Sequence, residues 1–355
     1  MSEDRKRLIL DLDTGIDDAL ALAYVLGSPE VELVAVVTSY GNVTAETAAR
    51  NTLSLLTMLG HPEIPVYLGA DRALSATKPF SPPSGVVRIH GKNGLGNQQP
   101  EAWCYTKPKD GLDFLVEALG SQGQPRGARK DEADSGQESR ALRAPVLYVP
   151  TGPLTNLATV LVRAPEFVRE LSQVTFMGGA LAVPGNVTAL AEANIHNDPE
   201  AADVVFGLGV PTRMIGLDVT HQVVLTREDT ARWRELNTNA GAFFADMTDH
   251  YIHIYEQNNP HLGGCALHDP LAVAAAIDPT LVGCLATNLR VELDGPARGR
   301  VVCDPDHLRD DKKNTEVALT VDASRFLDEF RTRVGRALRR AGEFCKLLPG
   351  RVTVE

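Results

Sequence analysis

The chain has 355 residues, of which 43% are apolar and 23% charged, and its formal net charge is -11. These fractions are typical of soluble globular proteins and exclude collagen-like, low-complexity and wholly disordered chains. The negative charge makes polymeric nucleic acids and anionic membranes poor partners, because such a surface repels polyanions.

Short apolar segments alternate with amphipathic segments of helix length along most of the chain. This alternation predicts an α/β fold, an open and mainly parallel sheet with helices on both faces. The predicted strands are 8–12, 33–38, 66–68, 146–149, 174–177 and 213–215. The predicted helices are 17–26, 44–59, 154–162, 199–206, 270–277 and 323–340. Residues 226–257 are expected to be mainly helical, and 287–321 alternates like a β-ribbon.

One segment interrupts this rhythm. Residues 121–140 contain no aliphatic side chain larger than Ala and are rich in Gly, Gln, Ser and charge. We expect a mobile surface insertion over 121–144. The strand expected at 146–149 resumes the α/β pattern, so 1–355 is expected to form one domain.

The five cysteines are scattered, with no Cys-x-x-Cys pair, which favours a reducing, cytoplasmic location. The charged N-terminal residues precede an apolar run too short for a signal peptide, and no run approaches the roughly 18 apolar residues of a membrane span.

Four carboxylates, Asp11, Asp13, Asp17 and Asp18, follow the first predicted strand and lead into the first helix. In open α/β sheets the crevice beyond the carboxyl ends of the strands binds ligands. An isolated Asp pair here would simply stabilise the N-terminus of the helix. Four such groups raise one another's pKa unless a cation lies among them, and an all-oxygen set suits a hard ion such as Ca²⁺ rather than Zn²⁺.

Residues 11–14 (Asp-Leu-Asp-Thr) partly resemble the Asp-x-Asp-x-Thr motif of haloacid-dehalogenase-like phosphohydrolases. In such an enzyme the first Asp is the nucleophile, the second is the acid/base, and a later acidic pair helps to hold Mg²⁺. No later segment of this chain matches that pair convincingly.

A longer series of motifs resembles the nucleoside hydrolases of the inosine-uridine type. Residues 11–19 are similar to the family's Asp-Thr-Asp-Pro-Gly-x-Asp-Asp-Ala, with Leu12 and Thr14 in place of Thr and Pro. The next matches are 37–43 (Val-Thr-Ser-Tyr-Gly-Asn-Val), 90–96 (His-Gly-Lys-Asn-Gly-Leu-Gly) and 150–158, which contains Thr-Gly-Pro-Leu-Thr-Asn. Segments 177–179, 185–186, 191–194, 198–202 and 268–272 follow in the family's order. Each motif alone is weak, but their joint order is specific.

The resemblance implies hydrolysis of the N-glycosidic bond of ribonucleosides, a role in purine or pyrimidine salvage, and a homodimer or homotetramer. It implies one Ca²⁺ held by Asp13, Asp18, the main-chain carbonyl of Thr151, and Asp269. The residues that it places around the ribose are Asp17, Asn42, Met177, Asn186, Glu192, Asn194 and Asp269. A site with this many polar side chains is expected to reject sugars that lack hydroxyls, because the side chains would then be left unpaired.

In this reading Asp13 is the general base for a metal-bound water. His268 would protonate the departing base, or would only orient its neighbour Asp269. The base contacts expected are His90, Tyr251 and Tyr255; the two tyrosines share a helical face and are equally plausible as core aromatics. The preferred base is left open. A non-catalytic nucleoside- or ribose-binding protein is the competing hypothesis, although the acids, amides and His-Asp pair are all retained.

Overall fold

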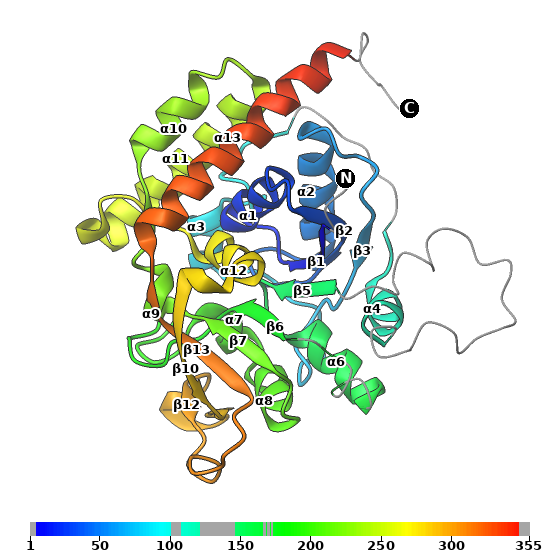
Figure 1. The fold of residues 1–355 in the computed structure, drawn as a ribbon, viewed down its shortest axis with the longest axis vertical. Helices are drawn as coiled ribbons and strands as arrows, with labels where there is room; N and C mark the ends of the chain where they lie inside the picture. Colours follow the sequence, from blue (N-terminus) through cyan, green and yellow to red (C-terminus); the bar gives the residue numbers. More distant parts are fainter. Residues whose placement is uncertain are drawn as a thin grey trace, which may run out of the picture.

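The computed structural model describes residues 5–100, 108–120, 146–165, 168, 171 and 173–347. The predicted insertion at 121–144 lies outside the described residues. Strands and helices alternate along the chain around a central layer of strands (Figure 1).

Five parallel strands form the first sheet, in the order β4-β3-β2-β1-β5. Their bounds are β1 Lys6–Leu12, β2 Val31–Thr38, β3 Val66–Leu68, β4 Lys109–Asp110 and β5 Val146–Pro150. In β1, Leu8, Leu10 and Leu12 enter one hydrophobic core while Ile9 enters the other. An almost continuously apolar strand is therefore buried on both faces, as expected in a parallel sheet.

A second sheet has the order β10-β13-β7-β6, in which β6, β7 and β13 are parallel and β10 is antiparallel. Its strands are β6 Val174–Met177, β7 Thr212–Ile215, β10 Val282–Thr287 and β13 Thr315–Val321. Because β5 contacts β6, the two sheets adjoin (Figure 1).

The prediction of a β-ribbon over 287–321 was partly wrong. Only β11 (Leu289–Val291) and β12 (Val301–Cys303) form a separate two-stranded ribbon, whereas β13 pairs with β7 in the second sheet. Alternation of side chains indicates a strand but does not name its partner. Another short pair joins β8 (Val224–Leu225) to β9 (Cys265–Ala266).

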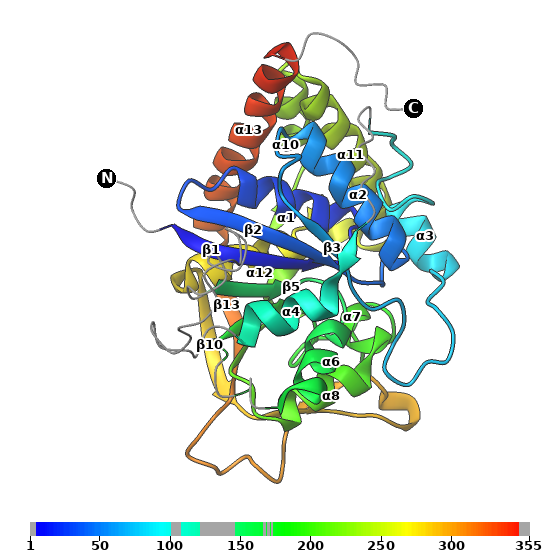
Figure 2. The ribbon, with the colours of Figure 1, turned by 90° about the vertical axis from the view of Figure 1, so that its right-hand side faces the viewer.

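Helices cover both faces of the strand layer, as predicted. α1 and α2 lie on one side and α4, α6 and α8 on the other (Figure 2). The helices are α1 Ile16–Leu26, α2 Ala45–Met58, α3 Ser84–His90, α4 Gly111–Gly120, α6 Thr155–Arg163, α7 Ala193–Asn197, α8 Pro199–Gly207, α9 Leu217–Thr220, α10 Arg227–Arg234, α11 Asn239–Asn258, α12 His268–Ile277 and α13 Ala323–Leu347. Within the part of the chain described, none of them combines the length and apolarity needed to cross a membrane.

The predicted helices and strands are confirmed, and most of their ends move by only one or two residues. Helix α13 is longer than predicted. α3, α4, α7 and α9 were not predicted; α3, α7 and α9 are too short for an apolar period to be visible.

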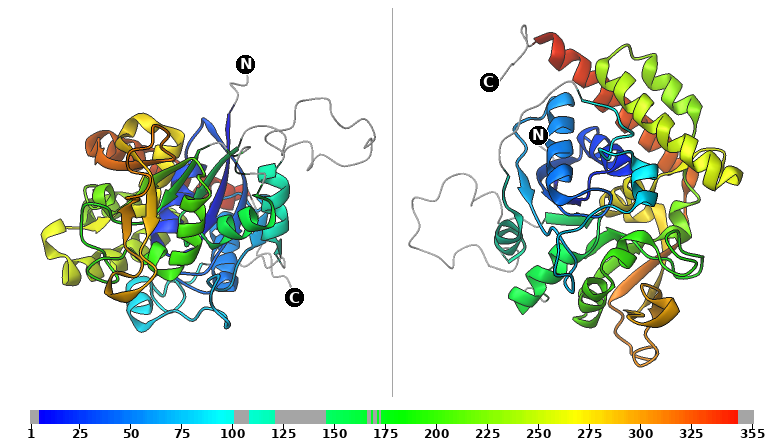
Figure 3. Two further views of the ribbon diagram at one scale, coloured as in Figure 1. Left: turned by 90° about the horizontal axis from the view of Figure 1, so that it is seen from below. Right: turned by 180° about the vertical axis from the view of Figure 1, so that it is seen from behind.

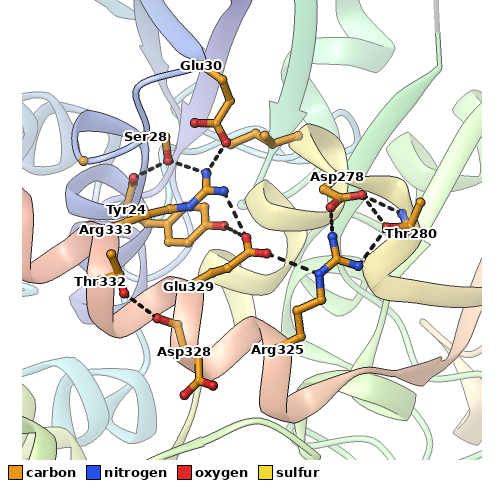
Figure 4. A network of polar contacts seen from close by, with 12 residues as sticks. Tyr24, Ser28, Glu30, Asp278, Thr280, Arg325, Asp328, Glu329, Thr332 and Arg333 are labelled. Carbon is orange, nitrogen blue, oxygen red and sulfur yellow. Dashed lines mark hydrogen bonds and ion pairs between the residues drawn. The ribbon is translucent and has the colours of Figure 1, made fainter.

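Helix α13 is fastened to α1 and also packs against α10 and α11 (Figure 3). Its Arg333 guanidinium lies 2.6 Å from a Glu30 carboxylate oxygen, donates to the Ser28 hydroxyl at 2.9 Å, and lies over the Tyr24 ring. Glu329, one turn earlier, accepts from the same guanidinium at 3.0 Å (Figure 4). These contacts hold the C-terminal end of α1, whose N-terminal end carries Asp17 and Asp18.

Candidate active site

The predicted site residues converge at the carboxyl ends of neighbouring parallel strands. Asp13 follows β1, Asn42 follows β2, Thr151 follows β5, and Met177 ends β6. Two helix N-termini join them: α1 brings Asp17 and Asp18, and α12 brings His268 and Asp269. The crevice beyond strand ends is where open α/β sheets bind ligands.

Asp17, Asp18 and Asp269 are buried, and each places a carboxylate oxygen within 4.8 Å of the others. The Oδ1 atom of Asp17 has no hydrogen-bond partner. A buried carboxylate oxygen without a partner is costly, and clustering three carboxylates adds mutual repulsion. A cation at this position would relieve both costs.

Burial and mutual repulsion act on the protonation of these groups. Burial raises the pKa of Asp17 to about 7, helped by the neighbouring Asp18 charge. The pKa of Asp13 and of Asp269 is held well above the ordinary value, chiefly by burial and then by the other aspartates. Burial and the proximity of several carboxylates are the expected causes of such shifts.

Asn42 orients the Asp13 carboxylate. Its main-chain N–H donates to Asp13 Oδ2 at 2.7 Å, and its side-chain amide donates to Asp13 Oδ1 at 3.0 Å. The same amide reaches Asp18 Oδ2 at 3.2 Å. Asp18 Oδ2 also accepts from the Gly15 N–H, while its Oδ1 accepts from the Thr151 hydroxyl at 2.7 Å. The two carboxylates are therefore fixed by groups from three strand ends.

Two glycines make this close packing possible. Gly41 has a φ of +154°, and a Cβ there would lie 2.0 Å from Asp13 Oδ2. A Cβ at Gly15 would lie 2.6 Å from His90 Nδ1 and 2.7 Å from Asn42 Nδ2. Any larger side chain at either position would displace a predicted site residue.

A second group of polar residues surrounds the end of β6. Asn194 donates to the Thr151 carbonyl at 2.6 Å and also contacts the carbonyl and sulfur of Met177. Glu192 is buried and accepts from the N–H groups of Gly179, Asn194 and Ile195. It thereby caps α7 and fixes Asn194 beside the carbonyl predicted to bind the metal.

Asn186 is placed differently from the other predicted residues. It is exposed, and its Oδ1 accepts from the Ala193 N–H at 3.0 Å. The Asn186 side chain therefore contacts Ala193, the first residue of α7, which directly precedes Asn194.

His268 is buried, and both of its ring nitrogens have partners. Nδ1 lies 2.8 Å from the Thr220 hydroxyl, and Nε2 lies 2.6 Å from the Tyr255 hydroxyl. Burial, with smaller contributions from His221 and His90, lowers the pKa of His268 to about 3. The ring is therefore neutral near pH 7, and each of its nitrogens is paired with a hydroxyl group.

Tyr251 and His90 approach the aspartates from another side. The Tyr251 hydroxyl donates to Asp17 Oδ2 at 3.5 Å, and its ring lies 5.0 Å from that of Tyr255 and 5.5 Å from that of His90. His90 Nδ1 accepts from the Ile16 N–H at 3.2 Å, so Nε2 carries the proton of the neutral ring. These rings lie beside the aspartates, and both tyrosines are also part of the buried hydrophobic core.

The arrangement combines a buried set of oxygen ligands, a positioned carboxylate and a neutral histidine joined to a tyrosine. The model of the inosine-uridine preferring nucleoside hydrolase family matches residues 8–328. The chain belongs to this family. It is an N-ribosyl hydrolase, and its relatives are nucleosidases and ribonucleoside hydrolases.

Several of those relatives are similar to this hydrolase over most of its length. Probable uridine nucleosidase 2 of Arabidopsis thaliana is 36% identical over 333 residues, covering 90% of this chain and 94% of the relative. The pyrimidine-specific ribonucleoside hydrolase RihA of Shigella boydii is 33% identical, covering 90% and 96%. A solved purine-preferring ribonucleoside hydrolase from Gardnerella vaginalis is 46% identical, with a TM-score of 0.84 and coverage of 94% and 99%.

A solved plant nucleoside hydrolase is 31% identical and has a TM-score of 0.79, covering 93% of this chain and 98% of that one. The resemblance noted in the sequence is therefore confirmed, as is the α/β fold. The phosphohydrolase and the non-catalytic binding protein are not favoured by these findings.

The sequence did not point to every residue that holds this hydrolase's site together. Thr220, which pairs with His268, was missed because an isolated Thr carries no motif. Buried Asp11 is not a member of the Asp17, Asp18 and Asp269 cluster: it accepts from the Tyr148 hydroxyl and the Asn156 amide. Asp11 lies two residues before Asp13, so strand alternation predicts that the two side chains share a face. It does not predict that Tyr148 and Asn156 are the partners of Asp11.

Proposed function

We propose that this enzyme hydrolyses free ribonucleosides to base and ribose with the help of one Ca²⁺. Asp13, Asp18, Asp269 and the Thr151 carbonyl would hold the ion. The observation that carries the proposal is that Asp18 and Asp269 lie together in the buried carboxylate cluster, while the Asn42 amide joins Asp13 to Asp18. An all-oxygen donor set fits Ca²⁺, which takes about 6 to 8 oxygen ligands including main-chain carbonyls.

The chain's own residues would carry the proton transfers. A bound cation supplies orientation and acidification of a water molecule. Asp13 would accept the proton of that water as general base, with its carboxylate held by the two Asn42 donors. The surrounding carboxylates would stabilise the positive charge that develops on the sugar.

The ribose side would be formed by Asp17, Asn42, Asn186, Glu192 and Asn194, with Asp269 near the hydroxyls and Met177 beneath the sugar. Asp17 supports this, because its Oδ1 atom has no hydrogen-bond partner and can accept a hydrogen bond from a ribose hydroxyl. Glu192 and Asn194 have fixed orientations, so they would bind a sugar without being reordered.

We place the base beside the rings of His90, Tyr251 and Tyr255, with His268 as the source of the proton for the departing base. Relatives described as pyrimidine-specific and as purine-preferring are both similar to this chain. A panel of inosine, uridine, cytidine, adenosine and guanosine decides which base this site prefers.

We also propose that residues 1–355 form one domain and that the enzyme is a cytoplasmic homodimer or homotetramer serving purine or pyrimidine salvage. The free thiols of Cys265, Cys284 and Cys303 support a reducing location. The family resemblance supports the assembly and the salvage role.

Removal of the metal is expected to abolish hydrolysis. Without a cation, the clustered aspartates repel one another and Asp13 loses the water it would deprotonate. Uridine and inosine hydrolysis should be measured before and after exhaustive chelation, with the metal content followed by elemental analysis. Added Ca²⁺ should restore the activity, and unchanged turnover in metal-free protein would show that the metal assignment is wrong.

Ribonucleosides are expected to be cleaved at least about tenfold faster than 2′-deoxynucleosides, in terms of kcat/KM. A missing hydroxyl leaves a buried polar group such as Asp17 unpaired, at about 1 to 3 kcal/mol. Nucleotides should also be poor substrates, because Glu192 would repel a 5′-phosphate. Uridine, 2′-deoxyuridine and uridine 5′-phosphate make the comparison, and equal kcat/KM for the first two would contradict the ribose assignment.

A further inference from the structure

The loop between β6 and α7, residues 178–192, has no regular secondary structure but is closely packed. We call it the substrate loop, because it contains Asn186 and ends at Glu192. Its Gly185 N–H donates to the Ala189 carbonyl at 3.1 Å. A Cβ on Gly185 would lie 2.2 Å from the Ala191 oxygen, so the two arms of the loop touch.

Two side chains from other parts of the chain hold this loop. Asp218, in α9, accepts from the N–H groups of Leu181 and Ala182 at 2.9 and 2.7 Å. The second, Arg300, binds the loop's carbonyl groups.

Arg300 bridges both arms of the loop. Its Nη1 donates to the Val183 carbonyl at 2.9 Å and to the Leu190 carbonyl at 3.2 Å, and its Nη2 donates to the Leu181 carbonyl at 2.5 Å. A planar guanidinium can hold several acceptors in a fixed geometry, which suits it to join two strands of irregular backbone. Removing it would leave the arms without this link.

Arg300 reaches the loop because the tip of the β11–β12 ribbon packs against it. Gly299 has a φ of +85°, and a Cβ there would lie 3.1 Å from the Ala191 Cβ and 3.2 Å from the His196 Cα. A ribbon about 100 residues away in sequence thereby touches both the end of the substrate loop and α7.

We infer that Arg300 is a positioning residue for the substrate. It holds the substrate loop in the conformation in which Asn186 contacts the ribose. The inference rests on the proposed function, since it uses the proposed contact of Asn186. Arg300 itself donates to three loop carbonyls and acts through the loop.

The role predicts a particular kinetic signature. Without Arg300 the free enzyme samples several loop positions, so substrate binding has to order the loop and the apparent affinity falls. The chemistry in the bound state uses the same aspartates as before. KM should therefore rise by about tenfold while kcat changes by less than about threefold.

The test compares Arg300→Ala with Arg298→Ala on the nucleoside that the parent enzyme turns over fastest. Arg298 is the matched control, because it lies on the same ribbon tip but its guanidinium binds Glu200 and the Leu293 carbonyl instead of the loop. Arg300→Ala should raise KM and Arg298→Ala should leave it unchanged. Arg300→Lys, which keeps the charge but cannot span both arms, should give an intermediate KM, and thermal unfolding checks that each variant is folded.

A double-mutant cycle with Asn186→Ala identifies the path of the effect. If Arg300 acts through the loop, the double variant should have a KM close to that of the worse single variant, because each change removes the same contact. A double variant whose KM rises by the product of the two single effects would overturn the inference. An unchanged KM in Arg300→Ala or in Asn186→Ala would also overturn it, as would an equal rise in the KM of Arg298→Ala. A parent enzyme that cleaves no ribonucleoside would instead refute the proposed function.

Discussion

Asp18→Ala is expected to lose the bound metal and the hydrolytic activity together. Asp18 connects three parts of the site, since its carboxylate accepts from the Gly15 N–H, the Asn42 amide and the Thr151 hydroxyl. The substitution removes a proposed metal ligand and also the carboxylate that accepts from the Thr151 hydroxyl. We expect kcat/KM to fall by at least about a thousandfold, which corresponds to about 4 kcal/mol of transition-state stabilisation.

The metal content and kcat/KM of Asp18→Ala should be measured on the same sample. Asp246→Ala is a suitable control, because Asp246 is an exposed aspartate of α11 that pairs with Arg234. It removes the same charge and should change neither quantity. Full metal content with full activity in Asp18→Ala would refute the ligand set, and full metal content with lost activity would assign Asp18 to another task.

His268→Ala is expected to slow natural nucleosides far more than an activated substrate. A natural base needs a proton to depart, whereas p-nitrophenolate leaves readily as an anion. If His268 supplies that proton, kcat on inosine or uridine should fall by about 10² to 10⁴, the usual contribution of general acid catalysis. Hydrolysis of p-nitrophenyl riboside should continue at nearly the parent rate.

Tyr255→Phe is the companion variant, because the Tyr255 hydroxyl is the partner of His268 Nε2. If the proton passes through this hydroxyl, Tyr255→Phe should show the same preference for the activated substrate. A purely orienting His268 predicts another pattern: a misplaced Asp269 would disturb the ribose and the metal, and both substrates would slow alike. Equal losses on the two substrates would therefore reject the acid role.

The sequence was sufficient for most of the fold, because burial leaves a periodic pattern. Leu8, Leu10 and Leu12 face one core and Ile9 the other, so β1 was visible as a buried strand. The pairing of β13 with β7 was not predicted, since side-chain alternation is the same whichever strand lies alongside. Residues 84–90 form less than two full turns of helix, too few for a period to stand out.

The site was partly predictable for a similar reason. Asp13, Asp17 and Asp18 are close in sequence and follow one strand, so their proximity could be deduced directly. Asp269 is about 250 residues away and was joined to them only through the family resemblance. Arg300 and Thr220 act through single hydrogen-bonding groups in segments without a motif, and only the three-dimensional structure reveals them.

The attachment of α13 to α1 has a consequence for the synthesis of the protein. Arg333 and Ser28, which are in contact, are 305 residues apart in the chain. At a synthesis rate of about 5 to 20 residues per second, helix α1 would wait roughly 15 to 60 s for this partner. During that time Tyr24 of α1 lacks Phe326 and Phe330, whose rings later pack against it. We therefore expect this enzyme to need a chaperone most while its N-terminal half has been synthesised and α13 has not.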